Sequence, residues 1–399
     1  MVDRRPPSPF GLPPLGAYLA AGPPPPLLFP PTSPPTSSPT RTDVQAAVAA
    51  AIGVSPSAAV VPGGVLAVVL AGGQGSRFVS ATPKVLVPFR ERPLASVVVA
   101  AATDAGAVPV TVVGHAAEQV VATLGGRRGG GERGTPPAAA ADDGDAPPPV
   151  AAFVLQEPRL GTGHAVGVAL AAAVPPSWAG AVLVLCADTP GVDGALLAGL
   201  LETHQRYVAA DARHGATVLT GSRAASTGGG DSYGRIVRAV PLNGRAGAGA
   251  TAVGACEAAD IAAAVIVDIV EKKTIATAAA GSDADAPVRT CGGIPYSAAA
   301  LDALDEFNSG VVVADAVALR SALLGLVAHP TGGGRSEYYV TDFVVAMADA
   351  GRTVRAAAMP PDQVWRVEGA NTVEELAALE RRVNSWSRHL PAIPGGRTA

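Results

Sequence analysis

The sequence is poor in the residues that mark several protein classes. Its three cysteines are too few and too widely spaced for a disulfide framework or a cysteine-rich zinc site, which suits a reducing compartment. The formal net charge of -4 provides no basic surface for nucleic acid. An anionic ligand must therefore be held by a local site.

Long apolar runs are also missing. No run approaches the roughly 18 to 20 residues that a membrane span needs. Prolines interrupt the apolar stretches at the N-terminus, where a signal peptide needs a continuous one. We therefore expect a cytoplasmic protein without a membrane or nucleic-acid partner.

Proline is abundant, and it is concentrated at the N-terminus. Of the 37 prolines, 14 fall within the first 40 residues, among serines and threonines. Such a segment buries too little apolar surface to fold, so we expect residues 1–63 to be disordered. We also expect a disordered insertion near 125–149, which is rich in glycine, alanine and proline, and a C-terminal tail at 385–399.

Short β-branched runs alternate with alanine- and leucine-rich stretches from residue 64 onward. Strand-like runs at 65–70, 108–113, 151–155 and 181–185 each precede a helical stretch. This alternation predicts an α/β fold of Rossmann-like type, with a mostly parallel sheet and helices on both faces. The nearly continuous apolar runs VLAVVL and AVLVL are typical of strands that are covered on both faces.

A glycine-rich turn follows the first of these runs. Glycine lets backbone N–H groups approach phosphate oxygens closely, and Arg77 and Lys84 can neutralise a triphosphate. The spacing matches neither the Walker loop nor the dinucleotide-binding fingerprint. We take Arg77 and Lys84 as candidate catalytic residues, and we assign nucleotide binding to Leu70, Ala71, Gly72, Gly73, Gly75 and Ser76.

A series of motifs in the same chain order resembles the sugar-nucleotide pyrophosphorylases, and in particular the bacterial N-acetylglucosamine-1-phosphate uridyltransferase domain. These motifs are LAGGQGSR at 70–77 with PK at 83–84, LQ at 155–156 with LGTGHA at 160–165, CAD at 186–188, YGRI at 233–236, IVEKK at 269–273, EYYVTD at 337–342 and VEGAN at 367–371. The resemblance covers roughly residues 65–384, and we expect residues 64–384 to form a nucleotidyltransferase domain. No left-handed β-helix repeats follow residue 384, so we expect the acetyltransferase half of the bifunctional members to be absent.

The resemblance implies the reaction and its cofactor. UTP and N-acetylglucosamine 1-phosphate would give UDP-N-acetylglucosamine and pyrophosphate, with Mg²⁺ as the cofactor. The sugar phosphate is already anionic, so it can attack the α-phosphate in line without a protein nucleophile or general base. The protein would then provide geometry and charge neutralisation.

For three polar residues, residue type and position suggest a role independently of the resemblance. Asp188 follows the run at 181–185, at the strand end where α/β sheets bind ligands, and its carboxylate suits Mg²⁺; the alternative is a helix N-cap. Gln156 carries a donor and an acceptor on one amide, as reading the imide edge of uracil requires; the alternative is a polar strand end. We expect His164 to pack at a helix start.

The resemblance assigns the remaining site residues. Gly161 and Thr162 would complete the base pocket, and Asn371 would join Asp188 at the metal. The sugar pocket would be formed by Gly234, Glu271, Cys291, Glu337, Tyr339 and Thr341.

Two positions in the sugar pocket leave alternatives open. Glu271 could instead belong to a surface charge cluster, and either Lys272 or Lys273 could contact the sugar phosphate. Cys291 stands where the family carries asparagine, and a thiol is the poorer hydrogen-bonding group. Another hexose 1-phosphate is therefore the alternative substrate, and a catalytically silent nucleotide-sugar-binding regulatory protein is the alternative class.

Overall fold

The structure is a computed structural model, and it describes most of the chain after residue 63 together with two short N-terminal elements. The described residues are 14–21, 27–28, 64–75, 78, 80, 82–125, 152–227, 230–239, 265–280, 286–332 and 335–389. No helix within these ranges combines the length and the apolar character needed to cross a bilayer.

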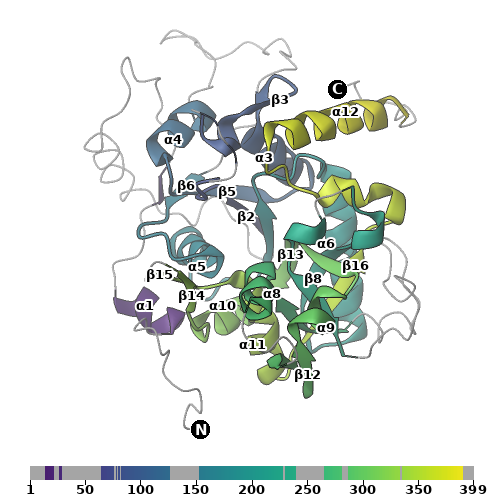
Figure 1. The fold of residues 1–399 in the computed structure, drawn as a ribbon. Coiled ribbons are helices and arrows are strands. Elements are labelled where there is room, and N and C mark those ends of the chain that lie inside the picture. The colour runs from purple at the N-terminus through teal and green to yellow at the C-terminus, as the bar shows by residue number, and fades with distance from the viewer. Residues whose placement is uncertain are drawn as a thin grey trace.

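A mixed sheet forms the centre of the described fold (Figure 1). Across the sheet its strands are β1 (Leu27–Leu28), β6 (Ala152–Leu155), β5 (Val108–Val113), β2 (Val65–Leu70), β7 (Ala181–Cys186), β13 (Glu306–Asp315), β8 (His214–Ser222), β16 (Thr353–Ala358), β10 (Val265–Val270) and β9 (Arg235–Arg238). The neighbours β6, β5, β2 and β7 are parallel, as are β8 and β16. β13 lies between β7 and β8 and is antiparallel to both.

Helices cover both faces of the sheet, which confirms the predicted fold class. Leu66 and Val68 face a core shared with α5 (Thr162–Ala173), α10 (Ala316–Leu324) and α11 (Phe343–Asp349). Ala67 and Val69 face the opposite core, shared with α3 (Leu94–Asp104), α4 (Ala117–Gly125) and α6 (Gly194–Ala210). Both faces of β2 are therefore apolar because alternate side chains enter two different cores.

Smaller elements complete the described structure. They are η2 (Lys84–Leu86), β3 (Pro88–Phe89), β4 (Arg92–Pro93), η3 (Arg223–Ala225), η4 (Gly230–Ser232), α8 (Lys272–Ala279), β11 (Pro287–Cys291), β12 (Ile294–Ser297), α9 (Ala298–Asp302), β14 (His329–Gly332), β15 (Arg335–Glu337), η5 (Val340–Asp342) and η6 (Pro361–Val367). The elements α8, α9, β11 and β12 share a separate small core around Ile275 and Leu301.

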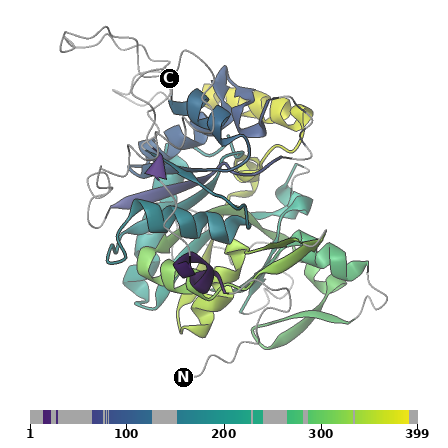
Figure 2. The ribbon, with the colours of Figure 1, turned by 90° about the vertical axis from the view of Figure 1, so that its left-hand side faces the viewer.

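The helix α1 (Leu15–Ala21) belongs to the folded part of the molecule, which differs from the expected disorder of 1–63. Leu15 is fully buried, and its N–H donates to the carbonyl oxygen of Leu326 at 3.0 Å. α1 lies against α5 and α10 (Figure 2). The sequence analysis missed this short apolar helix because the residues around it are rich in proline. Apart from residue 14 and strand β1, the rest of 1–63 lies outside the described residues.

The C-terminal helix α12 (Val373–His389) passes the expected domain end at 384. Trp386 meets Trp365 edge-on, with 6.1 Å between ring centroids, and the Arg366 guanidinium lies 5.7 Å from the centre of the Trp386 ring. These contacts hold the last turns of α12 against η6. Of the predicted insertion near 125–149, only Gly125, the end of α4, is among the described residues.

Candidate active site

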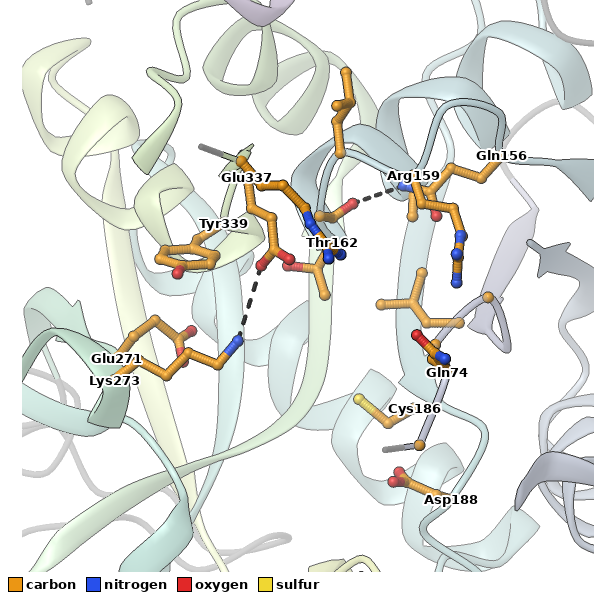
Figure 3. Close-up of a pocket in the computed structure, with 18 of the residues that line it drawn as sticks. Gln74, Gln156, Arg159, Thr162, Cys186, Asp188, Glu271, Lys273, Glu337 and Tyr339 are labelled. Carbon is orange, nitrogen blue, oxygen red and sulfur yellow. Dashed lines mark hydrogen bonds and ion pairs between the residues drawn. The ribbon is translucent and has the colours of Figure 1, made fainter. Parts of the chain in front are cut away.

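A cleft of about 980 Å³ lies at the carboxyl ends of β2, β6 and β7 (Figure 3). The glycine turn after β2 lines one side, and the other is lined by residues that follow β10, by β15 and by Tyr339 after it. The carboxyl ends of neighbouring parallel strands are where open α/β sheets bind ligands. The position of the cleft therefore follows from the strand order.

Lys84 and Asp188 form an ion pair in this cleft. Leu70 of β2 pairs with Cys186 of β7, so the turns that follow the two strands begin side by side. The Lys84 Nζ lies 2.5 Å from the Asp188 Oδ2, and the two side chains are 10% and 32% exposed. Gly75, with φ of 58°, lies so close that a Cβ there would be 3.0 Å from the Lys84 Cβ. The glycine turn thus makes room for the lysine.

The surroundings of Asp188 suit a cation that arrives with a phosphorylated ligand. The N-cap of α6 is Asp193, whose carboxylate accepts from the Leu196 N–H at 2.9 Å, so the helix-cap alternative for Asp188 is wrong. A Cβ on Gly369 would lie 3.3 Å from Asp188 Oδ1, which places the segment leading to Asn371 beside this carboxylate. Among the described residues no group of three or more His, Cys, Asp and Glu could hold a metal. One carboxylate that leaves further positions to phosphates and water is a common arrangement for Mg²⁺, so the donor set fits.

Gln156 continues the pairing of β5 and β6 and is almost completely buried. Its backbone N–H donates to the Val113 carbonyl oxygen at 2.8 Å. Its side-chain Nε2 donates to the Gly161 carbonyl oxygen at 2.8 Å and lies 3.2 Å from Nδ1 of His164. His164 is 2% exposed on α5, as its predicted packing role requires.

Backbone hydrogen bonds join the segment after Gln156 to the segment after β15. The Tyr338 N–H donates to the Leu160 carbonyl oxygen, and the Gly163 N–H donates to the Tyr338 carbonyl oxygen, both at 2.8 Å. Gly161 has φ of 93°, and a Cβ there would be 2.6 Å from the Tyr338 carbonyl oxygen. Two motifs that lie far apart in the sequence thus form one wall, and that wall requires glycine at 161.

Acidic and hydroxyl side chains gather at the other end of the cleft. Glu271 follows β10, and its Oε1 accepts from the Thr341 hydroxyl at 2.8 Å. Burial raises the pKa of Glu271 above its ordinary value. Burial also raises the pKa of Tyr339 to about 12, and its ring stacks on His329 with 4.8 Å between centroids. This end offers acceptors and hydroxyl groups, which suit a polyol.

The two lysines after Glu271 have different partners. Lys272 pairs with Asp302. Lys273 lines the cleft, and its Nζ lies 3.9 Å from Glu337 Oε2 (Figure 3). Of the two lysines, only Lys273 is therefore among the described residues that line the cleft.

Cys291, which the sequence analysis placed in the sugar pocket, does not line the cleft. Its thiol donates to Asp268 Oδ2 at 3.3 Å, and burial raises its pKa to about 12. Arg289 bridges Asp268, at 2.6 Å, and Asp342, at 3.4 Å. Asp268, with its bound arginine, holds the thiol away from the cleft.

The structure brings most of the predicted site residues together. Those that line the cleft are Leu70, Gly72, Gly73, Gly75, Lys84, Gln156, Gly161, Thr162, Asp188, Glu271, Glu337 and Tyr339. Thr341 is not part of the lining but donates to Glu271, which is, and Ala71, Gly234, Cys291 and Asn371 are not part of the lining either. Ser76 and Arg77 lie outside the described residues.

The sequence analysis missed four polar residues that line the cleft, Gln74, Arg159, Arg335 and Ser336. The stem of Arg159 lies on Gly114, where a Cβ would come within 2.9 Å of it, and Figure 3 shows its guanidinium between Gln156 and Gln74. The available signal was its place between two cleft motifs, at 155–156 and 160–165.

Residues 67–352 match the MobA-like NTP transferase domain. The chain belongs to the MobA-like NTP transferase family. Curated relatives of the chain include proteins named bifunctional protein GlmU. The one from Nocardia farcinica is 33% identical over 328 residues, which are 82% of this chain and 52% of that protein. The one from Burkholderia mallei is 34% identical over 317 residues, 79% of this chain and 51% of that protein.

The chain thus spans about half the length of the curated relatives it matches. Solved structures that match the chain include a putative glucose-1-phosphate thymidylyltransferase from Bacillus anthracis, with 16% identity and a TM-score of 0.45, covering 83% of this chain and 98% of that one. Another is a UDP-glucose pyrophosphorylase from Acinetobacter baumanii, with 18% identity and a TM-score of 0.46, covering 82% and 94%.

Proposed function

We propose that this NTP transferase forms UDP-N-acetylglucosamine and pyrophosphate from UTP and N-acetylglucosamine 1-phosphate. The observation that carries the proposal is that one cleft is lined by the Lys84–Asp188 pair, by Gln156 and by Glu271. A cation for phosphate, an amide for a base and a carboxylate for sugar hydroxyls thus lie around one volume. The motif resemblance and the GlmU relatives favour this pair of substrates over others.

The arrangement supports an order of ligand groups along the cleft. The base would lie at Gln156, and the triphosphate would run along the glycine turn toward Lys84. The sugar would meet Glu271, which Thr341 orients, and Lys273 would face the sugar phosphate. The phosphate of N-acetylglucosamine 1-phosphate would then approach the α-phosphate of UTP between the base end and the sugar end of the cleft.

Neither a histidine nor a reactive cysteine provides a nucleophile or base among the described residues of this cleft. No histidine is among its described lining residues. Cys186 lines it, but burial and the charge of Asp188 together raise the pKa of this thiol to about 12, so the thiol stays protonated at neutral pH. A direct attack by the anionic sugar phosphate needs neither group.

We assign the binding of the Mg²⁺ cofactor to Asp188, with Asn371 as the second ligand implied by the resemblance. When bound, the cation would neutralise charge on the nucleotide phosphates. Lys84, which pairs with Asp188 in the free protein, would contact phosphate oxygens of the nucleotide.

The test is product formation by the purified full-length chain with MgCl₂, UTP and N-acetylglucosamine 1-phosphate. Chromatography with mass detection should show UDP-N-acetylglucosamine and pyrophosphate in equal amounts. Glu271→Ala should reduce this rate, whereas Arg206→Ala, on the exposed surface of α6, should not. UDP-glucose formed faster from glucose 1-phosphate would reassign the sugar. Nucleotide binding without any product would favour a regulatory protein and contradict the proposal.

A further inference from the structure

The amide of Gln156 is held by two neighbours that determine which of its atoms faces the cleft. Its Nε2 lies 2.8 Å from the Gly161 carbonyl oxygen and 3.2 Å from His164 Nδ1. A carbonyl oxygen only accepts, and an imidazole nitrogen accepts when the ring proton is on the other nitrogen. Both N–H groups of the amide are therefore used inside the protein. Its Oε1 remains for a ligand.

A reversed amide conflicts with the same contacts. It would bring Oε1 to 2.8 Å from the Gly161 carbonyl oxygen, so that two acceptors would face each other. In the structure Oε1 lies beside Gly72, where a Cβ would come within 3.2 Å of it. Gly72 and Gln156 both line the cleft. The atom that Gln156 presents to the cleft is therefore a hydrogen-bond acceptor, its Oε1.

His164 is suited to the accepting role because it is neutral. It is 2% exposed, and burial lowers its pKa to about 4. With Nδ1 facing the Gln156 Nε2, the proton of the neutral ring belongs on Nε2. A proton on Nδ1 would instead set two donors against each other and favour the reversed amide.

We propose that His164 is a positioning residue for base selection, which holds the Gln156 amide with Oε1 toward the cleft so that uracil or thymine binds in preference to cytosine. Uracil and thymine present an N3–H donor, whereas N3 of cytosine carries a lone pair. An acceptor in the site attracts the first and repels the second. To bind cytosine, the Gln156 amide would have to flip, which would break its hydrogen bonds to the Gly161 carbonyl oxygen and to His164 Nδ1. This inference rests on the proposed function for the placement of the base at Gln156.

The experiment measures the dissociation constants of UTP and CTP by calorimetry on the full-length chain without sugar phosphate. His164→Leu removes the acceptor, and His164→Asn is the matched variant that keeps an acceptor near the position of Nδ1. The ratio of CTP to UTP dissociation constants should fall about fivefold in His164→Leu, the effect of one net hydrogen bond. It should stay within twofold of wild type in His164→Asn. If His164→Leu weakens both nucleotides equally, the residue is only structural and the inference is overturned.

A measurement on the wild-type chain keeps the inference testable if the leucine variant does not fold. Nitrogen-15 NMR of histidine-labelled protein should show His164 with its proton on Nε2, and N3-methyl-UTP, which lacks the donor, should bind at least tenfold more weakly than UTP. A proton on Nδ1, or equal binding of the methylated nucleotide, overturns the inference.

The outcomes separate the inference from the proposed function. UTP selectivity that depends on His164, in a chain that forms no product, would leave the inference standing and remove the function. Turnover of UTP with selectivity that does not change in His164→Leu would do the reverse. A wild-type chain that binds neither nucleotide would overturn both.

Discussion

Replacing Lys84 with methionine separates the proposed role of its charge from its role in packing. Methionine keeps an apolar stem of similar length beside Gly75, where a Cβ would lie 3.0 Å from the Lys84 Cβ, and removes the ammonium group. In the free protein this leaves Asp188 without its ion-pair partner. In the reaction it removes a cation from the proposed phosphate path.

The two consequences differ in size. Asp188 is 32% exposed, so water can solvate its carboxylate, and the lost pair costs at most about 1 kcal/mol of unfolding free energy. A preorganised donor that meets charge developing in the transition state is worth about 3 to 4 kcal/mol, or 10² to 10³ in kcat. We therefore expect Lys84→Met to lower kcat at least a hundredfold while Tm falls by no more than a few degrees.

The assay is a coupled pyrophosphate assay with saturating substrates, accompanied by thermal unfolding of each variant. Arg206→Ala is the control, because it removes a cation whose side chain is 42% exposed and paired with Glu202 on α6. It should leave both kcat and Tm near wild type. A kcat for Lys84→Met within tenfold of wild type, in a folded protein, would refute the assignment of Lys84 to the phosphates.

The remaining predictions concern the sugar end, the N-terminal helix and acid stability. Glu271→Gln should raise KM for the sugar phosphate about tenfold and change KM for UTP less than twofold, because an N–H group would replace an acceptor; a larger change for UTP would contradict the sugar role. Leu15→Ala should lower the free energy of unfolding in urea by about 2 to 5 kcal/mol, because Leu15 is fully buried, whereas the exposed Val208→Ala should change it by less than about 0.5; equal effects would contradict the packing of α1. Burial lowers the pKa of His204 to about 4 and of His214 to about 2, while both titrate near 6.5 when unfolded. The unfolded chain then binds protons that the folded chain does not, so stability should fall as pH drops from about 6.5 toward 4, and a urea midpoint that is constant from pH 7 to 5 would contradict this.

The strands of the parallel core could be predicted almost to the residue. The predicted runs at 65–70 and 108–113 coincide with β2 and β5, because strands with two covered faces are continuously apolar and stand out from the helices. The antiparallel insertion of β13 between β7 and β8 could not be predicted. Its pairing depends on contacts between segments that lie far apart in the chain.

The candidate site could be predicted where a motif follows a strand directly. Gln156 and Asp188 lie in the cleft because they follow the ends of β6 and β7 closely. For residues outside these strands, the sequence could not predict which way the side chain points. Cys291 turns to Asp268, and Lys272 pairs with Asp302. In each case the decisive partner lies more than 20 positions away in the sequence.

The initial rate of pyrophosphate release by the purified chain tests the central claim most directly, with UTP, dTTP, GTP, ATP and CTP each crossed against the 1-phosphates of N-acetylglucosamine, glucose and mannose. The account predicts that release requires both substrates and is fastest with UTP and N-acetylglucosamine 1-phosphate. Release with a purine nucleotide that exceeds the rate with UTP, or no release with any pair, would contradict it.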